Sequence, residues 1–180
     1  MRARVIPSLF VAALAVTSVL GPTWPADAGI PQGRYAIGDS VMLGARQALV
    51  ARGFRVNAEV SRQFDDAVQL VRQLAAAGHL PVELIVHLGT NGLIDGADCD
   101  ALMRAAGSRR HVSLVTVKVP RPYRDVNNTR LRACAHRHDN ASVIDWYAFS
   151  RFHTAWFYGD GYHLTPTGRQ EYAAFIAHSV

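Results

Sequence analysis

Short hydrophobic runs alternate with amphipathic stretches along most of this 180-residue chain, and this alternation constrains the fold more than any other feature. The clearest run covers residues 84–88 (Leu-Ile-Val-His-Leu) and suits a strand that is buried on both faces. Strands that alternate with helical patterns are typical of a parallel sheet covered by helices. We therefore predict an α/β fold, a three-layer αβα sandwich whose sheet has about five parallel strands in the order 2-1-3-4-5.

The other elements follow from the same periodicities, and no repeat, low-complexity tract or second domain interrupts them. We expect strands at residues 34–38, 54–58, 84–88, 112–119 and 143–145. Apolar residues at helical spacing predict the helices between them, with inward faces made by Met42, Ala45, Leu49 and Val50, by Phe64, Ala67, Val68, Val71 and Leu74, by residues 99–106 and by residues 127–137. The last helix begins with Thr165 as its cap and Pro166 at its first position, and it turns Tyr172, Phe175 and Ile176 inward.

The N-terminal segment has the pattern of a secretory signal. Arg2 and Arg4 precede the uncharged, mostly apolar residues 5–20, and Ala26-Asp27-Ala28 fits a small-x-small cleavage site. We predict a signal peptide over residues 1–28, a single domain over residues 29–180, and a secreted or extracytoplasmic protein. The alternative is an uncleaved N-terminal membrane anchor, because the apolar run approaches spanning length.

The chain has two cysteines, Cys99 and Cys134. In an oxidising compartment an even pair favours a disulfide, and two separate buried thiols are the alternative. Cys134 with His136 and His138 could suggest a metal site, but this spacing does not put all three on one helical face. We therefore expect no metal.

The formal net charge is +5, and basic residues gather between Arg109 and Arg137. This run contains one aromatic residue, Tyr123, rather than a repeated interleaving of aromatic with basic residues, and no nucleic-acid-binding motif, so we interpret it as a solvated face and expect no nucleic-acid partner.

Three short signatures carry the chemistry. They are Gly38-Asp39-Ser40, Gly89-Thr90-Asn91 and Asp160-Gly161-Tyr162-His163. Ser40 follows the first predicted strand and Asn91 follows the third, which are neighbours in the predicted order. Ligands bind at the carboxyl ends of such strands, near this switch point, and the loop of Asp160 and His163 reaches the same edge.

The residue types suit nucleophilic catalysis without a cofactor. The hydroxyl of Ser40 needs an adjacent base, for which His163 is the candidate, and Asp160 can orient the imidazole. The Ser40 backbone N–H and the Asn91 amide can donate to an oxyanion. The structural alternative is that Ser40 caps a helix, Asn91 occupies a turn, and Asp160 with His163 forms a surface turn.

Other polar residues are expected to have supporting roles. We expect Asp39 to brace the turn and His87 to be a hydrogen-bonded core residue, while His153 is a weaker candidate for a base or a substrate contact. The loops after Asn91 and around Tyr123 and Trp156 are expected to shape the pocket.

These signatures make the chain resemble the SGNH, or GDSL, hydrolase superfamily, whose fold is flavodoxin-like. It looks most similar to the SGNH domain of membrane acyltransferases such as the peptidoglycan O-acetyltransferases. The matching blocks are residues 37–45 (IGDSVMLGA), 61–63 (SRQ), 87–92 (HLGTNG), 143–146 (VIDW) and 160–165 (DGYHLT) with Gly168. The resemblance covers the chain from about Arg34 to its end.

The resemblance implies a triad of Ser40, Asp160 and His163, with Asn91 as an oxyanion donor. A further oxyanion N–H comes in this family from a glycine of the second block, where this chain has Ser61. A backbone N–H does not require glycine, so we expect Ser61 to donate. The membrane-spanning donor module of the subgroup has no counterpart in this sequence.

We therefore expect an exported serine esterase, acting as a monomer, that removes acyl groups, acetyl in particular, from a carbohydrate or a related small molecule. One alternative is an O-acyltransferase acting on a glycan, supplied with acyl groups by a membrane partner. The other is a non-catalytic glycan-binding module on the same fold.

Overall fold

Five parallel strands pair into one sheet in the order β2-β1-β3-β4-β5, as the sequence predicts. The computed structural model describes residues 31–180, so the predicted signal peptide and its cleavage site lie outside the described residues. The strands are β1 (Arg34–Gly38), β2 (Phe54–Ala58), β3 (Glu83–His87), β4 (His111–Val115) and β5 (Ala141–Ile144). No helix within residues 31–180 has the length and hydropathy needed to cross a bilayer.

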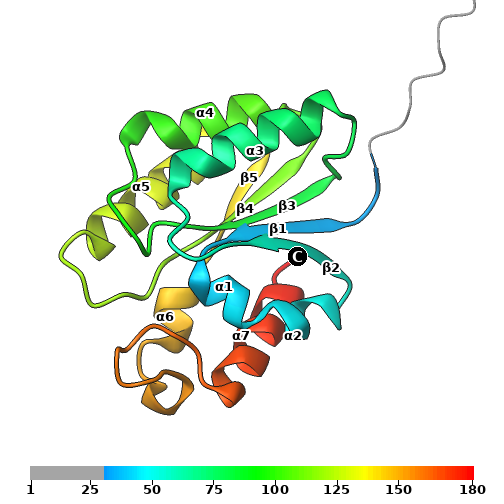
Figure 1. Cartoon of the computed structure of the whole chain (residues 1–180). Coiled ribbons are helices and arrows are strands. Elements are labelled where there is room, and N and C mark those ends of the chain that lie inside the picture. The colour runs from blue at the N-terminus through cyan, green and yellow to red at the C-terminus, as the bar shows by residue number, and fades with distance from the viewer. Residues whose placement is uncertain (1–30) are drawn as a thin grey trace, which may run out of the picture.

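Helices cover both faces of the sheet and make the three layers of Figure 1. One face carries α3 (Phe64–Ala76), α4 (Gly96–Ala106) and α5 (Arg124–Arg137), and the other carries α1 (Ser40–Gly44), α2 (Arg46–Val50), α6 (Trp146–Ser150) and α7 (Pro166–His178). A one-turn 3₁₀ helix, η1 (Thr154–Trp156), precedes α7.

The central strand β3 is buried on both faces, which explains its unbroken hydrophobic sequence. Leu84 and Val86 pack into the core beneath α3, α4 and α5. Ile85 points the other way and packs into the core shared with α1, α2 and α7. Successive side chains of a strand alternate between faces, so one short run supplies both cores.

The first predicted helix is broken in the structure. It ends at Gly44 and restarts at Arg46, with Ala45 outside helical geometry between them. The break rotates the second segment, so Ala48 and Leu49 face the core whereas the Val50 side chain is 54% exposed. The prediction that Val50 lies on the buried face is therefore wrong.

The fourth strand is shorter than predicted. It ends at Val115, because β5 ends at Ile144 and no partner strand continues beyond it. The backbone of Val117 instead pairs with the side chain of Asn128, which accepts from the N–H at 2.8 Å and donates to the C=O at 3.0 Å. Helix α6, which was not predicted, begins directly after β5 with Asp145 as its cap.

Cys99 of α4 and Cys134 of α5 form a disulfide, which confirms that prediction and removes the alternative of two separate thiols. The bond joins two neighbouring helices on one face of the sheet. Closing a loop of 35 residues stabilises the fold by about 4 kcal/mol in the chain-entropy account.

Candidate active site

The carboxyl ends of β1 and β3 bring the predicted residues to one edge of the sheet. Ser40 is the first residue of α1, two positions after β1 ends at Gly38. In the parallel register Gly38 lies opposite His87, the last residue of β3, and Asn91 follows four positions later. The two signatures thus meet at the switch point between neighbouring strands.

A continuous hydrogen-bonded chain links Ser40, His163 and Asp160. The Ser40 Oγ lies 3.0 Å from His163 Nε2, and His163 Nδ1 lies 2.7 Å from Asp160 Oδ2. An ionised Asp160 accepts a hydrogen bond from the Nδ1–H of His163, so the other ring nitrogen carries no proton and can accept the hydroxyl proton of Ser40. The arrangement has the connectivity of a nucleophile, a base and an orienting carboxylate.

The loop that carries Asp160 and His163 is held by its own hydrogen bonds. Asp160 Oδ1 accepts from the backbone N–H groups of Tyr162 (3.1 Å) and His163 (3.0 Å). Partial burial raises the pKa of Asp160, but these two N–H groups and the His163 ring outweigh it and leave that pKa below its ordinary value. Asp160 is therefore a carboxylate at neutral pH and keeps the imidazole in one orientation.

Helix α7 closes against the start of this loop because residue 168 is glycine. A Cβ on Gly168 would lie 2.0 Å from the carbonyl oxygen of Trp156, so no larger residue fits there. The same carbonyl accepts from the N–H of Thr165, and Thr165 Oγ1 caps the helix by accepting from the N–H of Gly168. The predicted cap and the predicted proline at the first helical position are both confirmed.

The predicted oxyanion donors come from three segments at this edge. The Ser40 N–H belongs to the first turn of α1, where a helix has no carbonyl partner for it. Ser61 has a backbone φ of +61°, the left-handed region that favours glycine. The Asn91 amide donates to the Arg62 carbonyl at 3.4 Å, so Asn91 lies against the loop that carries Ser61.

Arg62, which sequence reasoning did not assign, holds the Ser61 loop in place. Its buried guanidinium donates to the carbonyls of Gly38 (3.3 Å) and Asn57 (2.6 Å) and to the Asn57 side chain (2.7 Å). It also pairs with Glu59 at 3.1 Å. Arg62 therefore fixes the loop to the ends of β1 and β2. These contacts hold Ser61 in its left-handed backbone conformation, which serine seldom adopts.

Asn127 of α5 likewise holds the loop that carries Asn91 in place. Its amide donates to the carbonyls of Gly89 and Gly92, both at 2.8 Å, and its oxygen accepts from the N–H of Ile94 at 2.9 Å. Gly89 has a φ of +110°, and a Cβ there would lie 2.8 Å from the Ile94 side chain. The sequence places Asn127 at the start of the helix predicted over residues 127–137, but nothing in it indicates that this side chain bonds the loop of Asn91.

Asp39 and His87 have the supporting roles that the sequence predicts. Asp39 is fully buried and caps α1 by accepting from the N–H of Val41 at 2.9 Å, and burial raises its pKa. His87 is buried with its Nδ1 2.8 Å from the Tyr172 hydroxyl.

Burial lowers the pKa of His87 from 6.5 to about 3, so the folded protein keeps this imidazole neutral in mild acid. The unfolded chain binds the proton below pH 6.5 and the folded chain does not, so the stability falls as the pH drops from 6.5 towards 3. We expect a loss of about 1.4 kcal/mol per pH unit in that window from this residue. Urea unfolding at pH 7, 6 and 5 measures it: His87→Gln flattens the dependence, and the exposed control His79→Gln leaves it unchanged. An equal slope in both variants would contradict the assignment.

A cavity of about 470 Å³ opens beside Ser40. Its lining is mainly apolar and consists of Ser40, Leu43, Gly44, Val60, Tyr158, Asp160, His163, Leu164 and Arg169. Tyr123 and Trp156 do not themselves line it, but Tyr158, two positions after Trp156, does, so of the loops predicted to shape the pocket the one around Trp156 contributes to this cavity. The Tyr123 hydroxyl instead donates to the Thr90 carbonyl at 2.9 Å, and Trp156 packs against Trp146.

His153 does not contact the Ser40 hydroxyl. Its ring stacks on Trp156 at a centroid distance of 3.8 Å, outside the lining of the cavity. The ring that bonds Ser40 is that of His163. The weaker candidate base thus belongs to an aromatic cluster.

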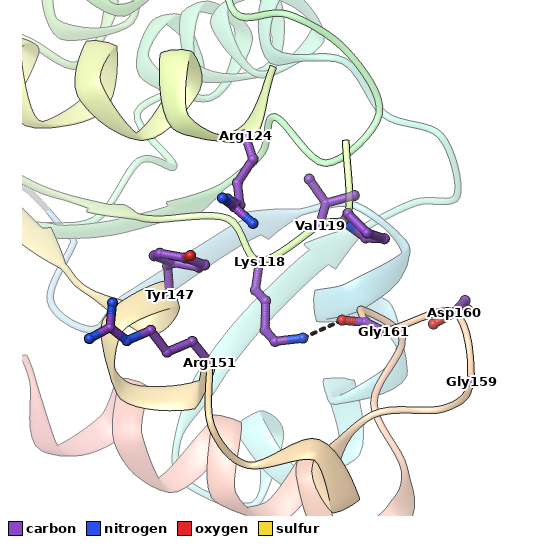
Figure 2. A pocket seen from close by; sticks show the side chains of 9 residues that line it. Lys118, Val119, Arg124, Tyr147, Arg151, Gly159, Asp160 and Gly161 are labelled. Atoms are coloured by element: carbon purple, nitrogen blue, oxygen red, sulfur yellow. Dashed lines mark hydrogen bonds between the residues drawn. The ribbon is translucent and has the colours of Figure 1, made fainter. Parts of the chain in front are cut away.

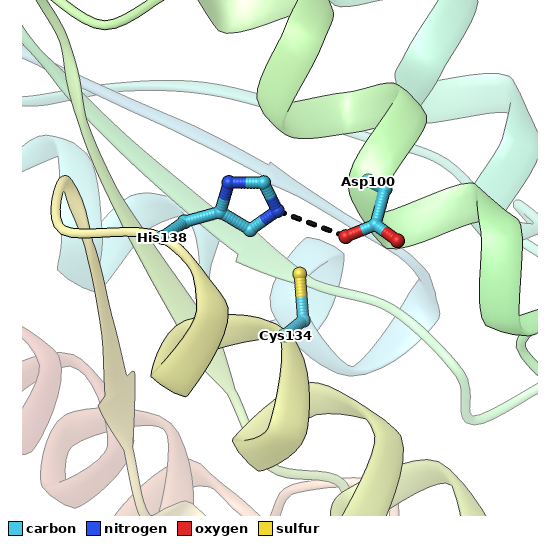
Figure 3. Close-up of side chains that lie close together, drawn as sticks. All are labelled: Asp100, Cys134 and His138. Carbon is cyan, nitrogen blue, oxygen red and sulfur yellow. Dashed lines mark hydrogen bonds and ion pairs between the residues drawn. The ribbon is translucent and has the colours of Figure 1, made fainter.

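Asp100, Cys134 and His138 come close together between α4 and the end of α5 (Figure 3). The Cys134 sulfur is already bonded to Cys99, so it is not a thiolate that could ligate a metal. His138 Nε2 lies 2.8 Å from Asp100 Oδ1, which Arg137 also approaches at 2.8 Å. These contacts make the cluster an ion-pair group beside the disulfide.

The chain is similar in sequence to bacterial O-acetyltransferases. It is 32% identical over 147 residues to YrhL of Bacillus subtilis (strain 168), covering 81% of this chain and 23% of YrhL. It is 30% identical over 135 residues to the O-acetyltransferase OatA of Staphylococcus aureus (strain NCTC 8325 / PS 47), covering 73% of this chain and 22% of OatA. The chain thus spans less than a quarter of the length of these relatives. No protein-family profile matches it.

A solved structure has the same fold. It is the C-terminal catalytic domain of peptidoglycan O-acetyltransferase A from Streptococcus pneumoniae, solved with a methylsulfonyl adduct. The TM-score is 0.76 at 25% identity, and the match covers 83% of this chain and 93% of that domain.

Proposed function

We propose that this chain, which has the fold of the SGNH/GDSL hydrolases, is a serine acyl-transfer enzyme whose nucleophile is Ser40. The observation that carries the proposal is the hydrogen-bonded chain from the Ser40 hydroxyl through His163 to Asp160. A serine is a weak nucleophile alone, and this chain supplies the base and the carboxylate that activate it.

In the first half-reaction His163 Nε2 takes the proton of Ser40 while Oγ attacks the carbonyl carbon of an ester. The tetrahedral oxyanion receives hydrogen bonds from the N–H groups of Ser40 and Ser61 and from the Asn91 amide. Collapse expels the alcohol, which takes the proton from His163, and leaves an acyl group on Ser40. A second hydroxyl, deprotonated by His163, then attacks the acyl-enzyme and regenerates the serine.

We propose transfer of an acetyl group to a glycan hydroxyl as the main reaction, ahead of the esterase activity that the sequence first suggests. The likeness to O-acetyltransferases along most of the chain supports this order. All three of these proteins are named for O-acetyl transfer, and the names of YrhL and of the pneumococcal protein also specify peptidoglycan. The acetyl donor would come from a membrane partner.

Hydrolysis is the second candidate, favoured by the exposure of the site. The His163 and Asp160 side chains are 37% and 40% exposed, so water can reach an acyl group on Ser40. Which reaction dominates depends on whether a bound glycan hydroxyl excludes water from the second step.

The disulfide supports an extracytoplasmic location, because such bonds persist in oxidising compartments. Together with the signal pattern of residues 1–28, it leads us to propose that the enzyme acts outside the cytoplasm.

The partition of the acyl-enzyme tests the proposed function. Residues 29–180 are supplied with p-nitrophenyl acetate, with and without peptidoglycan fragments, and acetylated glycan and free acetate are quantified. We expect acetylated glycan to form at the expense of free acetate, and neither product to form with Ser40→Ala. Free acetate alone with every glycan would make the enzyme a hydrolase. Glycan binding without Ser40-dependent turnover would make the chain a binding module.

A further inference from the structure

A second cavity, of about 420 Å³, adjoins the active site, and its basic side chains have no part in the mechanism above (Figure 2). It shares Asp160 with the cavity beside Ser40, so the two meet at the catalytic loop. Figure 2 shows the three cationic side chains among the residues that line it, each from a separate segment. Lys118 comes from the segment after β4, Arg124 is the first residue of α5, and Arg151 follows the last residue of α6.

These positive charges are poorly balanced by the protein itself. Within residues 31–180 no carboxylate lies within ion-pair distance of Lys118 or Arg151. Arg124 pairs with Asp125, whose side chain is 73% exposed and lies outside the lining. The one carboxylate that lines the cavity, Asp160, is already bonded to His163. The lining therefore has three cationic side chains and one carboxylate, which already bonds His163.

Each of these three cations lies over an aromatic ring. The Arg124 guanidinium lies 4.6 Å from the centroid of the Tyr147 ring, Lys118 Nζ lies 3.8 Å from that of Phe157, and the Arg151 guanidinium lies 4.5 Å from that of its neighbour Phe152. Lys118 also donates to the carbonyl of Gly161, as Figure 2 shows. Burial lowers the pKa of Lys118, and repulsion from the nearby Arg124 lowers it further, while Asp160 acts in the opposite direction.

We propose that this cavity is a subsite for an anionic group, a carboxylate or a phosphate, on the glycan that the enzyme acylates. The proposal rests on the proposed function and adds to it the substrate class, an acidic glycan. Guanidinium groups bind both anions through paired N–H donors, and an anion placed between Lys118, Arg124 and Arg151 would relieve their repulsion. Because the cavity borders Asp160, a sugar that places its charge there can present a hydroxyl towards Ser40.

Direct binding tests the subsite without requiring turnover. The probes are N-acetylglucosamine, N-acetylmuramic acid and N-acetylglucosamine 6-phosphate, which differ in bearing no anion, a carboxylate or a phosphate. With the Ser40→Ala variant we expect at least one acidic sugar to bind about tenfold more tightly than the neutral one, by chemical-shift titration. The preferred acidic sugar identifies which anion the site takes. Equal affinity for all three sugars would overturn the proposal.

A matched set of variants locates the effect. The double variant Arg124→Gln/Arg151→Gln, in the Ser40→Ala background, is expected to lose the preference for the acidic sugar, whereas Arg72→Gln on α3 removes an exposed arginine elsewhere and retains it. A preference that survives the double substitution would also overturn the proposal. The same double substitution in the chain with Ser40 is expected to leave turnover of neutral p-nitrophenyl acetate unchanged. If the wild-type chain did not turn over p-nitrophenyl acetate, the proposed function would be contradicted, and the binding test of the subsite would still stand.

Discussion

Replacing Ser40 with alanine is expected to reduce kcat/KM for p-nitrophenyl acetate by about 10⁴-fold or more. The substitution removes the atom that forms the acyl-enzyme and leaves only binding and oxyanion stabilisation, which give a small residual rate. Initial rates of p-nitrophenol release measure the effect. Ser108→Ala, at an exposed position remote from the three signatures in sequence, is the matched control and should retain the wild-type rate.

The same prediction extends to a pair of substitutions. Because Ser40 and His163 act as one unit, His163→Ala is expected to cost about as much as Ser40→Ala, and the double variant is expected to be no slower than either. Additive losses, or a Ser40→Ala variant within tenfold of the wild type, would rule out nucleophilic catalysis at Ser40.

Replacing Asn91 with alanine is the second large effect that the geometry predicts. We expect kcat to fall by about 10²–10³-fold with KM little changed, because the amide donates to an oxyanion that exists only in the transition state. The Asn91 loop itself should survive, since Asn127 and Tyr123 bond its backbone carbonyls.

Asn140→Ala is the control for a general loss of stability. The Asn140 amide donates to the carbonyls of Gly107 and Arg110, away from the site, so its removal should lower the unfolding midpoint and leave kcat unchanged. If Asn91→Ala retains kcat within about threefold, or raises KM alone, Asn91 is not an oxyanion donor.

The strand order and the meeting of Ser40 with Asn91 could be predicted because both follow from local signals. Buried strands show continuous apolar runs, and parallel strands joined by helices bring their carboxyl ends to one edge. The contact between Ser40 and His163 spans 123 positions, yet its residue types and its place at that edge predicted it.

Features that depend on distant packing could not be predicted. The rotation of Val50 towards solvent follows from the break at Ala45, which the preceding Gly44 does not by itself predict, because a single glycine inside a helical pattern is tolerated. The bracing of the two oxyanion loops comes from Arg62 and Asn127, whose partners are backbone carbonyls that carry no sequence signal. The basic cavity gathers Lys118, Arg124 and Arg151 from segments that are separate in the sequence.

Ser61 lies between these two cases. The resemblance indicated a backbone donor at this position, where the family has a glycine and this chain has a serine. Ser61 nevertheless has a left-handed backbone, and the next residue, Arg62, fixes the loop by donating to the Asn57 carbonyl. A backbone requirement can thus be met by a non-glycine residue when the surrounding contacts hold it.

The central claim is that Ser40 carries the acyl group, and intact mass spectrometry of the quenched enzyme during turnover of p-nitrophenyl acetate tests it most directly. We predict one added acetyl group, mapped to Ser40 by peptide fragmentation, and none on the Ser40→Ala variant. Ser40-independent acetate release without an adduct, or an acetyl group on another residue that is discharged at the rate of turnover, would contradict the account.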